Sequence, residues 1–282
     1  MKGKKLSKKI IFWIVCSAII GTILIACLGL QIAFMIADKI ECWHPDYEMV
    51  SIKSVLNQQE LSDEDYELIY RQTGVTKLGV DRMLARGQRG KQQLIKIQED
   101  FFAEHPVQND LFAPLVCTDY IEDDITYVDL EDGDIILTSS THLSGWRIGH
   151  SGLVTNASFG SILQANAIGD TSTLGSMRDF SDRVNFMIVS PKVDKELKAK
   201  VCRYAEENLI GKVYDPTAGV FSKKDSLSKT QCAHLVWYAY NHFGVDLDCG
   251  GGLVVTPKDI ANSPLVEIVQ VFGFDIDNLW KY

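Results

Sequence analysis

One cysteine occupies a position in the sequence where its thiol could act as a nucleophile. Cys232 follows the polar stretch 228–230 and begins an apolar, helix-like run that continues to Phe243. Unpaired N–H groups and the dipole at a helix start stabilise a thiolate, the nucleophilic form of cysteine. Position alone leaves two interpretations of Cys232: a reactive thiolate, or a small buried residue on a helix face.

A histidine that could serve as the general base lies upstream, at the start of a predicted strand. Residues 149–154 form an apolar run entered through Gly149, and His150 is its second residue. An imidazole there could deprotonate a thiol and later protonate a leaving group. The alternative is a strand histidine whose ring is satisfied by a backbone carbonyl.

A polar residue on the next predicted strand could orient that imidazole. Gln164 is flanked by apolar residues in the run 161–165. An amide oxygen can fix the histidine tautomer, as a carboxylate does in other catalytic triads. Asn166 lies two residues further, on the same face, and is the alternative third residue. Gln164 could equally be an exposed strand residue.

The sequence lacks the motifs of metal sites, nucleotide-binding loops and serine hydrolases. His234 is two residues after Cys232, about 200° around a helix, and is poorly placed as its base. His234 and His242 do not form an HExxH pattern, and the sequence contains no CxxC, Walker A loop or GxSxG. We therefore expect no metal site and no cofactor.

The elements that must position these residues follow an α+β pattern from about residue 116. Short apolar runs with glycine-rich breaks predict strands, and two amphipathic stretches predict helices. Thr256-Pro257 has the pattern of a helix start, with a cap and a proline at the first position. The strands are predicted at 134–138, 149–155, 161–165, 185–189 and 265–272, and the helices at 194–209 and 231–243.

A helical segment precedes this region. Ser62 and Asp65 form an N-terminal capping pattern, and Gly74 ends that helix. The stretch 80–102 is helical in pattern, with a break near residues 87–90. We expect a helical stalk or an extension packed on the next domain. A helix-turn-helix fits the pattern, but the net charge of −9 argues against nucleic acid as a partner.

The N-terminus predicts a membrane anchor. Ile10 to Ile36 is apolar and uncharged, which is long enough for a helix to cross the hydrocarbon core. Five lysines precede residue 10, so the positive-inside rule places residues 1–9 in the cytoplasm and everything after about residue 37 outside. One alternative is a lipobox at residues 24–27 that would make Cys27 a lipidated N-terminus. The apolar residues after Cys27 favour the uncleaved anchor.

Composition sets the remaining limits. The 282 residues are 46% hydrophobic and 23% charged, which is ordinary globular usage. Subtracting the five N-terminal lysines from the net charge of −9 leaves −14 for the rest of the chain. Seven cysteines are too few for a disulfide scaffold, and the five beyond the apolar run are an odd number.

Five short motifs, taken in order, resemble the permuted papain-like branch of the NlpC/P60 superfamily, the YiiX/YebB-like cysteine hydrolases. The resemblance covers roughly residues 116–270, and in it the histidine precedes the cysteine, the reverse of papain. The motifs are residues 132–136 (DGDII), 149–154 (GHSGLV), 211–215 (GKVYD), 231–240 (QCAHLVWYAY) and 256–260 (TPKDI).

The resemblance implies a fold and roles for four residues. Cys232 would be the nucleophile, His150 the base and Gln164 the third member, where the family often has Glu. Tyr214 matches a family tyrosine near the active site and would help to bind an oxyanion. The Ser-Glu that commonly follows the family cysteine is Ala233-His234 here, so substrate contacts differ.

The expected organisation is a cytoplasmic basic tail (1–9), a transmembrane signal-anchor (10–36), a helical extension (37–115) and a circularly permuted papain-like catalytic domain (116–282). We expect a membrane-anchored, extracytoplasmic cysteine hydrolase that acts through an acyl-enzyme. By analogy its substrates would be cell-wall peptides (peptidoglycan). The alternatives are an acyltransferase or lipid-ester hydrolase of the same superfamily, which would act on acyl lipids, or a catalytically inactive binding module.

Overall fold

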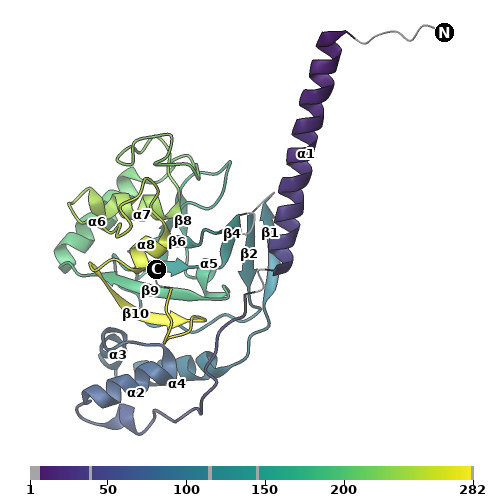
Figure 1. The fold of residues 1–282 in the computed structure, drawn as a ribbon. Helices are drawn as coiled ribbons and strands as arrows, with labels where there is room; N and C mark the ends of the chain where they lie inside the picture. The colour runs from purple at the N-terminus through teal and green to yellow at the C-terminus, as the bar shows by residue number, and fades with distance from the viewer. Residues whose placement is uncertain (1–6, 38–39, 114–115, 144–145, 281–282) are drawn as a thin grey trace.

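The computed structural model of the chain describes residues 7–37, 40–113, 116–143 and 146–280 (Figure 1). The helices are α1 (Lys8–Ala37), α2 (Asp63–Thr73), α3 (Lys77–Leu84), α4 (Gln88–Phe102), α5 (Arg178–Ser181), α6 (Lys195–Asn208), α7 (Cys232–Asn241) and α8 (Pro257–Ala261), with a 3-10 turn at Val55–Asn57. The strands are β1 (Gln108–Ala113), β2 (Val116–Tyr120), β3 (Ile135–Thr138), β4 (Thr141–Leu143), β5 (Trp146–Arg147), β6 (His150–Asn156), β7 (Ser161–Gln164), β8 (Thr173–Gly175), β9 (Phe186–Pro191) and β10 (Val266–Phe272).

A six-stranded antiparallel sheet in the order β10-β9-β3-β6-β7-β8 forms the centre of the domain. Side chains alternate between its two faces, because successive residues of a strand point in opposite directions. On β3, Ile135 and Leu137 pack with residues of α6 and α7, whereas Ile136 packs with residues of α2, α3 and α4. The sheet is therefore covered by helices on both faces (Figure 1). The α+β prediction and the predicted strands of this sheet are confirmed.

The helical segment before the sheet is an extension packed on it. Ser62 and Asp65 form the predicted capping box of α2, and Gly74 ends the helix in the left-handed conformation at φ 68°. The chain then runs beside β10, where the amide of Val271 donates to the Gly74 carbonyl (2.8 Å). A Cβ at Gly74 would lie 2.1 Å from the Val271 oxygen, so only glycine fits this approach.

A second, four-stranded antiparallel sheet in the order β1-β2-β4-β5 was not predicted. Its strands are too short for alternation to be read from the sequence: β4 has three residues and β5 has two. The expected boundary between residues 115 and 116 falls inside the β1–β2 hairpin, and β1 lies in the segment expected to be helical.

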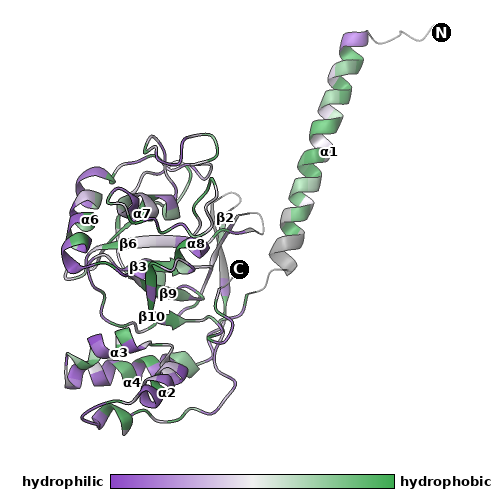
Figure 2. Cartoon of the chain, turned by 60° about the vertical axis from the view of Figure 1, so that its left-hand side comes forward, coloured by the Kyte–Doolittle hydropathy of each residue, from purple (hydrophilic) through white to green (hydrophobic). Residues whose placement is uncertain are grey.

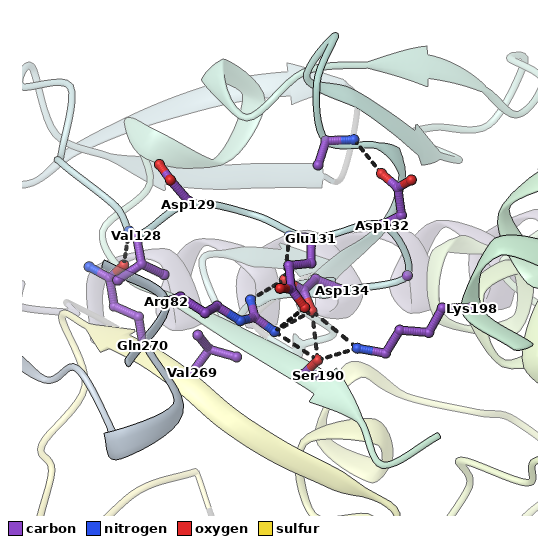
Figure 3. A network of polar contacts seen from close by, with 12 residues as sticks. Arg82, Val128, Asp129, Glu131, Asp132, Asp134, Ser190, Lys198, Val269 and Gln270 are labelled. Atoms are coloured by element: carbon purple, nitrogen blue, oxygen red, sulfur yellow. Dashed lines mark hydrogen bonds and ion pairs between the residues drawn. The ribbon is translucent and has the colours of Figure 1, made fainter. Parts of the chain in front are cut away.

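A buried polar network ties α3 to the central sheet (Figure 3). Arg82 on α3 donates to both carboxylate oxygens of Asp134, at 2.6 and 3.1 Å, and the Asp134 side chain is fully buried. Ser190 on β9 donates to the same carboxylate at 2.7 Å, and Lys198 on α6 donates to Ser190 at 2.6 Å. One network thus joins the extension, the residue before β3, a central strand and the covering helix α6.

Helix α1 lies outside this core. It is the one helix among the described residues that is long and apolar enough to cross a membrane, and its span Lys8–Leu30 is not buried against the rest of the chain. Figure 2 shows apolar colouring along most of its described length. Length and composition thus agree with the predicted anchor, and Cys27 lies within a helix that continues to Ala37.

Candidate active site

Cys232 is the first residue of α7, as predicted, and α7 packs against β6. Gln231 caps the helix: its side-chain oxygen accepts the Ala233 amide at 2.8 Å and lies 3.4 Å from the Cys232 sulfur. The other end of the same amide donates to the Val255 carbonyl at 2.5 Å. The cap therefore fixes the helix start and the cysteine together.

The sulfur of Cys232 is buried, and burial raises the pKa of its thiol above the ordinary value. The Ala233 amide and the Ser151 hydroxyl oppose this, because both favour a thiolate, but they do not outweigh the loss of water. The hydrogen bonds at the helix start therefore favour a thiolate, but burial exceeds them, and the pKa of the Cys232 thiol lies above its ordinary value.

His150 is the first residue of β6 and meets Gln164 of β7. The Nε2 atom of His150 lies 2.9 Å from the Gln164 side-chain oxygen. Gly152 pairs with Gln164 in the β6–β7 register, so His150 and Gln164 are diagonal neighbours on one face of the sheet. The ring of His150 also stacks on Phe180 of α5, at 5.4 Å between centroids and 14° between planes.

A fourth residue, Asp179 of α5, sets the orientation of the Gln164 amide. The Gln164 nitrogen donates to an Asp179 carboxylate oxygen at 2.6 Å, and the Ser176 amide donates to the same oxygen at 3.0 Å. Because a carboxylate only accepts, the amide nitrogen must face Asp179 and the oxygen must face His150. His150 Nε2 then donates, which leaves Nδ1 as the basic nitrogen.

Gly175 of β8 makes this arrangement possible. A Cβ at residue 175 would lie 2.0 Å from the Gln164 side-chain nitrogen and 2.3 Å from the Asp179 carboxylate. Any other residue would push the two side chains apart. The glycine therefore belongs to the construction of the hydrogen-bond chain from Asp179 through Gln164 to His150.

Burial lowers the pKa of His150 from its ordinary value to about 4. The hydrogen bond that His150 donates to the Gln164 oxygen opposes this shift, the Arg183 charge adds to it, and the Asp179 charge opposes it. The imidazole is therefore neutral near pH 7, as a general base must be.

Cys232 and His150 line one narrow cavity of about 20 Å³. Among the described residues no hydrogen bond joins the sulfur to the imidazole, and such contacts often tighten only when a substrate is bound. The other lining residues are mostly apolar, with Tyr214 among them: Thr141, Ile148, Gly149, Asn166, Ala167, Ile168, Tyr214 and Pro216.

The structure also places the remaining candidates. Tyr214 is half-buried beside Cys232, and burial together with Cys232 raises the pKa of its phenol, which therefore stays protonated as a possible donor. Asn166 follows the end of β7, is exposed and has no hydrogen bond to His150, so Gln164 is the residue that meets the ring. His234 is held by the Thr230 hydroxyl and the Lys224 carbonyl, at 2.9 and 2.7 Å.

Sequence reasoning missed Ser151, Asp179 and Arg183. Ser151 carried a weak signal, because it adjoins His150 in the motif. Asp179 and Arg183 lie on and just after a four-residue helix whose position depends on tertiary packing, so no spacing pointed to them. Within the described residues there is no group of three His, Cys, Asp or Glu side chains that could hold a metal ion.

Comparison with known proteins adds no family to this description. No protein-family model matches the chain, and neither a curated protein nor a solved structure matches it.

Proposed function

We propose that the chain is a membrane-anchored cysteine hydrolase with a circularly permuted papain-like domain, whose catalytic residues are Cys232, His150 and Gln164. The observation that carries the proposal is that Cys232, at the start of a helix, shares a cavity with a neutral histidine whose ring is oriented by an amide. A nucleophile, a base and an orienting group in this order are the requirements of acyl transfer through a thiol.

The chemical steps follow from these assignments. His150 Nδ1 accepts the thiol proton while the Cys232 sulfur attacks a carbonyl carbon of an amide or ester. The resulting imidazolium gives its proton to the leaving amine or alcohol, and an acyl-enzyme forms. Water, deprotonated by His150, then hydrolyses the thioester and restores the thiol. The Tyr214 phenol, which lines the same cavity, would donate to the oxyanion.

The test is turnover of full-length protein on peptidoglycan fragments and on acyl esters. Cys232→Ala should abolish it, and Cys249→Ala, which changes an exposed cysteine, should not. Iodoacetamide supplies a second readout, since His150→Ala should slow alkylation of Cys232 and leave that of Cys249 unchanged. Turnover equal in wild type and Cys232→Ala would show that Cys232 is not the nucleophile. Turnover absent on both substrate classes would leave the inactive binding module as the better assignment.

A second function of the same superfamily, an acyltransferase or lipid-ester hydrolase, is favoured by one observation. The wall of the Cys232 cavity includes Ile148, Ala167, Ile168 and Pro216, which suit an acyl chain better than a peptide backbone. Acyl esters turned over faster than peptidoglycan fragments would select this function. Product analysis with an added amine or alcohol acceptor would separate transfer from hydrolysis.

We further propose that the catalytic domain lies outside the cytoplasm. The lysines before residue 10 and the apolar helix α1 support this orientation through the positive-inside rule.

A further inference from the structure

A second cavity of about 120 Å³ shares His150 with the cavity that holds Cys232. Its walls differ in kind, because every lining residue is polar or charged: Thr118, Thr141, His150, Gln164, Asn166, Asp179 and Arg183. Thr118 and Thr141 come from β2 and β4, where they are directly paired. The small sheet therefore supplies one wall and the central sheet another.

Arg183 is the cation of this cavity. Its Nε atom donates to the Asp179 backbone carbonyl at 2.9 Å, which fixes the guanidinium plane, and its side chain is only 21% exposed. The nearest described carboxylate oxygen is that of Asp182, 3.7 Å from Nε. The two Nη groups have no hydrogen-bond partner among the described residues.

Two carboxylates, those of Asp182 and Asp179, act on this cation. Asp182 pairs with Nε, and one oxygen of the Asp179 carboxylate accepts from Gln164 and from the Ser176 amide. Among the described residues, neither carboxylate has a hydrogen bond with the Nη groups. Arg183 is thus partly exposed and ion-paired with Asp182, while its two Nη groups line a polar cavity without a hydrogen-bond partner among the described residues. An anion that enters the cavity would supply acceptors to both Nη groups.

We propose that this cavity is an anion subsite, in which the Arg183 guanidinium binds a carboxylate or phosphate group of the substrate next to His150. The inference rests on the proposed hydrolase function and deepens it. The planar fork of arginine matches both kinds of anion. Thr118 and Thr141 offer hydroxyl donors in the same cavity. A substrate would thus carry its scissile carbonyl at Cys232 and its anionic group beyond the His150 ring.

The first test measures anion binding without catalysis. Full-length Cys232→Ala protein in detergent, with labelled histidines, is titrated with inorganic phosphate and with acetate. We expect saturable binding that raises the pKa of His150, because a negative charge beside the ring favours its protonated form. The described charged groups that act on His150 are Asp179 and Arg183. Loss of one signal in His150→Gln assigns the resonance.

The variants make the test specific. Arg183→Gln should abolish the anion effect, and Arg183→Lys, which keeps the charge but not the fork, should weaken binding about tenfold. Arg178→Gln is the matched control, because Arg178 is an exposed arginine on the neighbouring α5. Absence of binding by both anions, or binding unchanged in both Arg183→Gln and Arg183→Lys, would overturn the proposal. Preference for acetate indicates a carboxylated substrate, and preference for phosphate a phosphorylated one.

A second test separates this subsite from the hydrolase assignment. Arg183→Gln should raise KM about tenfold for an ester or amide bearing an anionic group, and leave KM unchanged for its neutral analogue. If anions bind at Arg183 while Cys232→Ala has no effect on turnover, the hydrolase proposal fails and the subsite stands. If turnover requires Cys232 but neither anion binds, the subsite fails and the hydrolase stands.

Discussion

The imidazole of His150 is held by an amide whose own orientation is imposed by a carboxylate. The neutral Gln164 can direct the ring but cannot stabilise an imidazolium by charge. The nearest link to a negative charge is through Gln164 itself, because its amide nitrogen donates to the Asp179 carboxylate at 2.6 Å. At the residue scale the candidate site therefore consists of Cys232 and a hydrogen-bonded chain of three side chains, His150, Gln164 and Asp179, in which Asp179 is the positioning residue.

The first prediction tests this chain. Gln164→Ala should lower kcat/KM by less than the roughly 10²- to 10⁴-fold that a general base contributes, because only orientation is lost. Gln164→Glu sets a second carboxylate against that of Asp179, so the two share a proton. This variant should keep part of the activity and raise the pKa of His150, since the pair brings its negative charge next to the ring. The pH–rate profiles of the three proteins measure both effects. Asn166→Ala, which changes an exposed neighbour, should match the wild type. A crippled Asn166→Ala beside a silent Gln164→Ala would reverse the assignment.

Asp179→Asn extends the same prediction. An asparagine can donate as well as accept, so it no longer dictates which end of the Gln164 amide faces His150. Activity should fall, and the double variant Gln164→Glu/Asp179→Asn should recover it, because the new carboxylate accepts from both neighbours. A merely structural role for Asp179 would give equal activity in Asp179→Asn and in the double variant.

The second prediction concerns pH and does not depend on the reaction. The folded-state pKa of His150 is about 4, below the ordinary value of 6.5, so the unfolded chain binds the proton more strongly. The contribution of His150 to the free energy of unfolding is therefore fully present above pH 6.5. It decreases by about 3 kcal/mol as the pH falls toward 4. Urea unfolding in detergent at pH 7.5 and 4.5 measures the loss. His150→Gln should show a smaller loss, and an equal loss would show that burial does not perturb His150.

At the scale of elements, the Arg82–Asp134 pair fastens the helical extension to the sheet. Arg82→Met would leave the fully buried Asp134 without its bidentate partner, at a cost of about 3–5 kcal/mol in unfolding free energy. Arg86→Met is the control, because Arg86 pairs with Asp129 where both side chains are about one-third exposed, and it should cost at most about 1 kcal/mol. Denaturant unfolding of the two variants and the wild type measures these losses of unfolding free energy. Similar losses would mean that the buried network does not fasten α3.

The elements that could be predicted are those whose signals are local. Helix ends can be predicted because caps and turns involve only residues that are close in sequence. Examples are Ser62 and Gly74 at the two ends of α2 and Thr256 at the start of α8. The strands of the small sheet depend instead on partners far along the chain, as Thr118 and Thr141 show. The same division applies to the site: Cys232, His150 and Gln164 lie on predicted elements, whereas Asp179 and Arg183 owe their positions to packing.

At the scale of the whole molecule, the apolar helix α1 and the candidate site lie in different parts of the chain. Helix α1 has the length and composition of a membrane span, and the central sheet, covered on both faces, positions the candidate site. Among the side chains that the structure describes, none from α1 lines either cavity of that site. The apolar helix and the candidate site are thus separate features of the chain, and each can be tested without the other.

The last prediction concerns topology and uses the cysteines of the chain. Cys249 is exposed on the domain, whereas Cys42, Cys117, Cys202 and Cys232 are buried and the other two lie in α1. A membrane-impermeant maleimide should therefore label Cys249 in intact spheroplasts if the domain is outside the cytoplasm. Cys249→Ser should remove the label. Labelling that appears only after lysis would place the domain inside.

The intact mass distinguishes the uncleaved helix from the lipidated form, because a lipidated Cys27 would begin a chain that lacks residues 1–26.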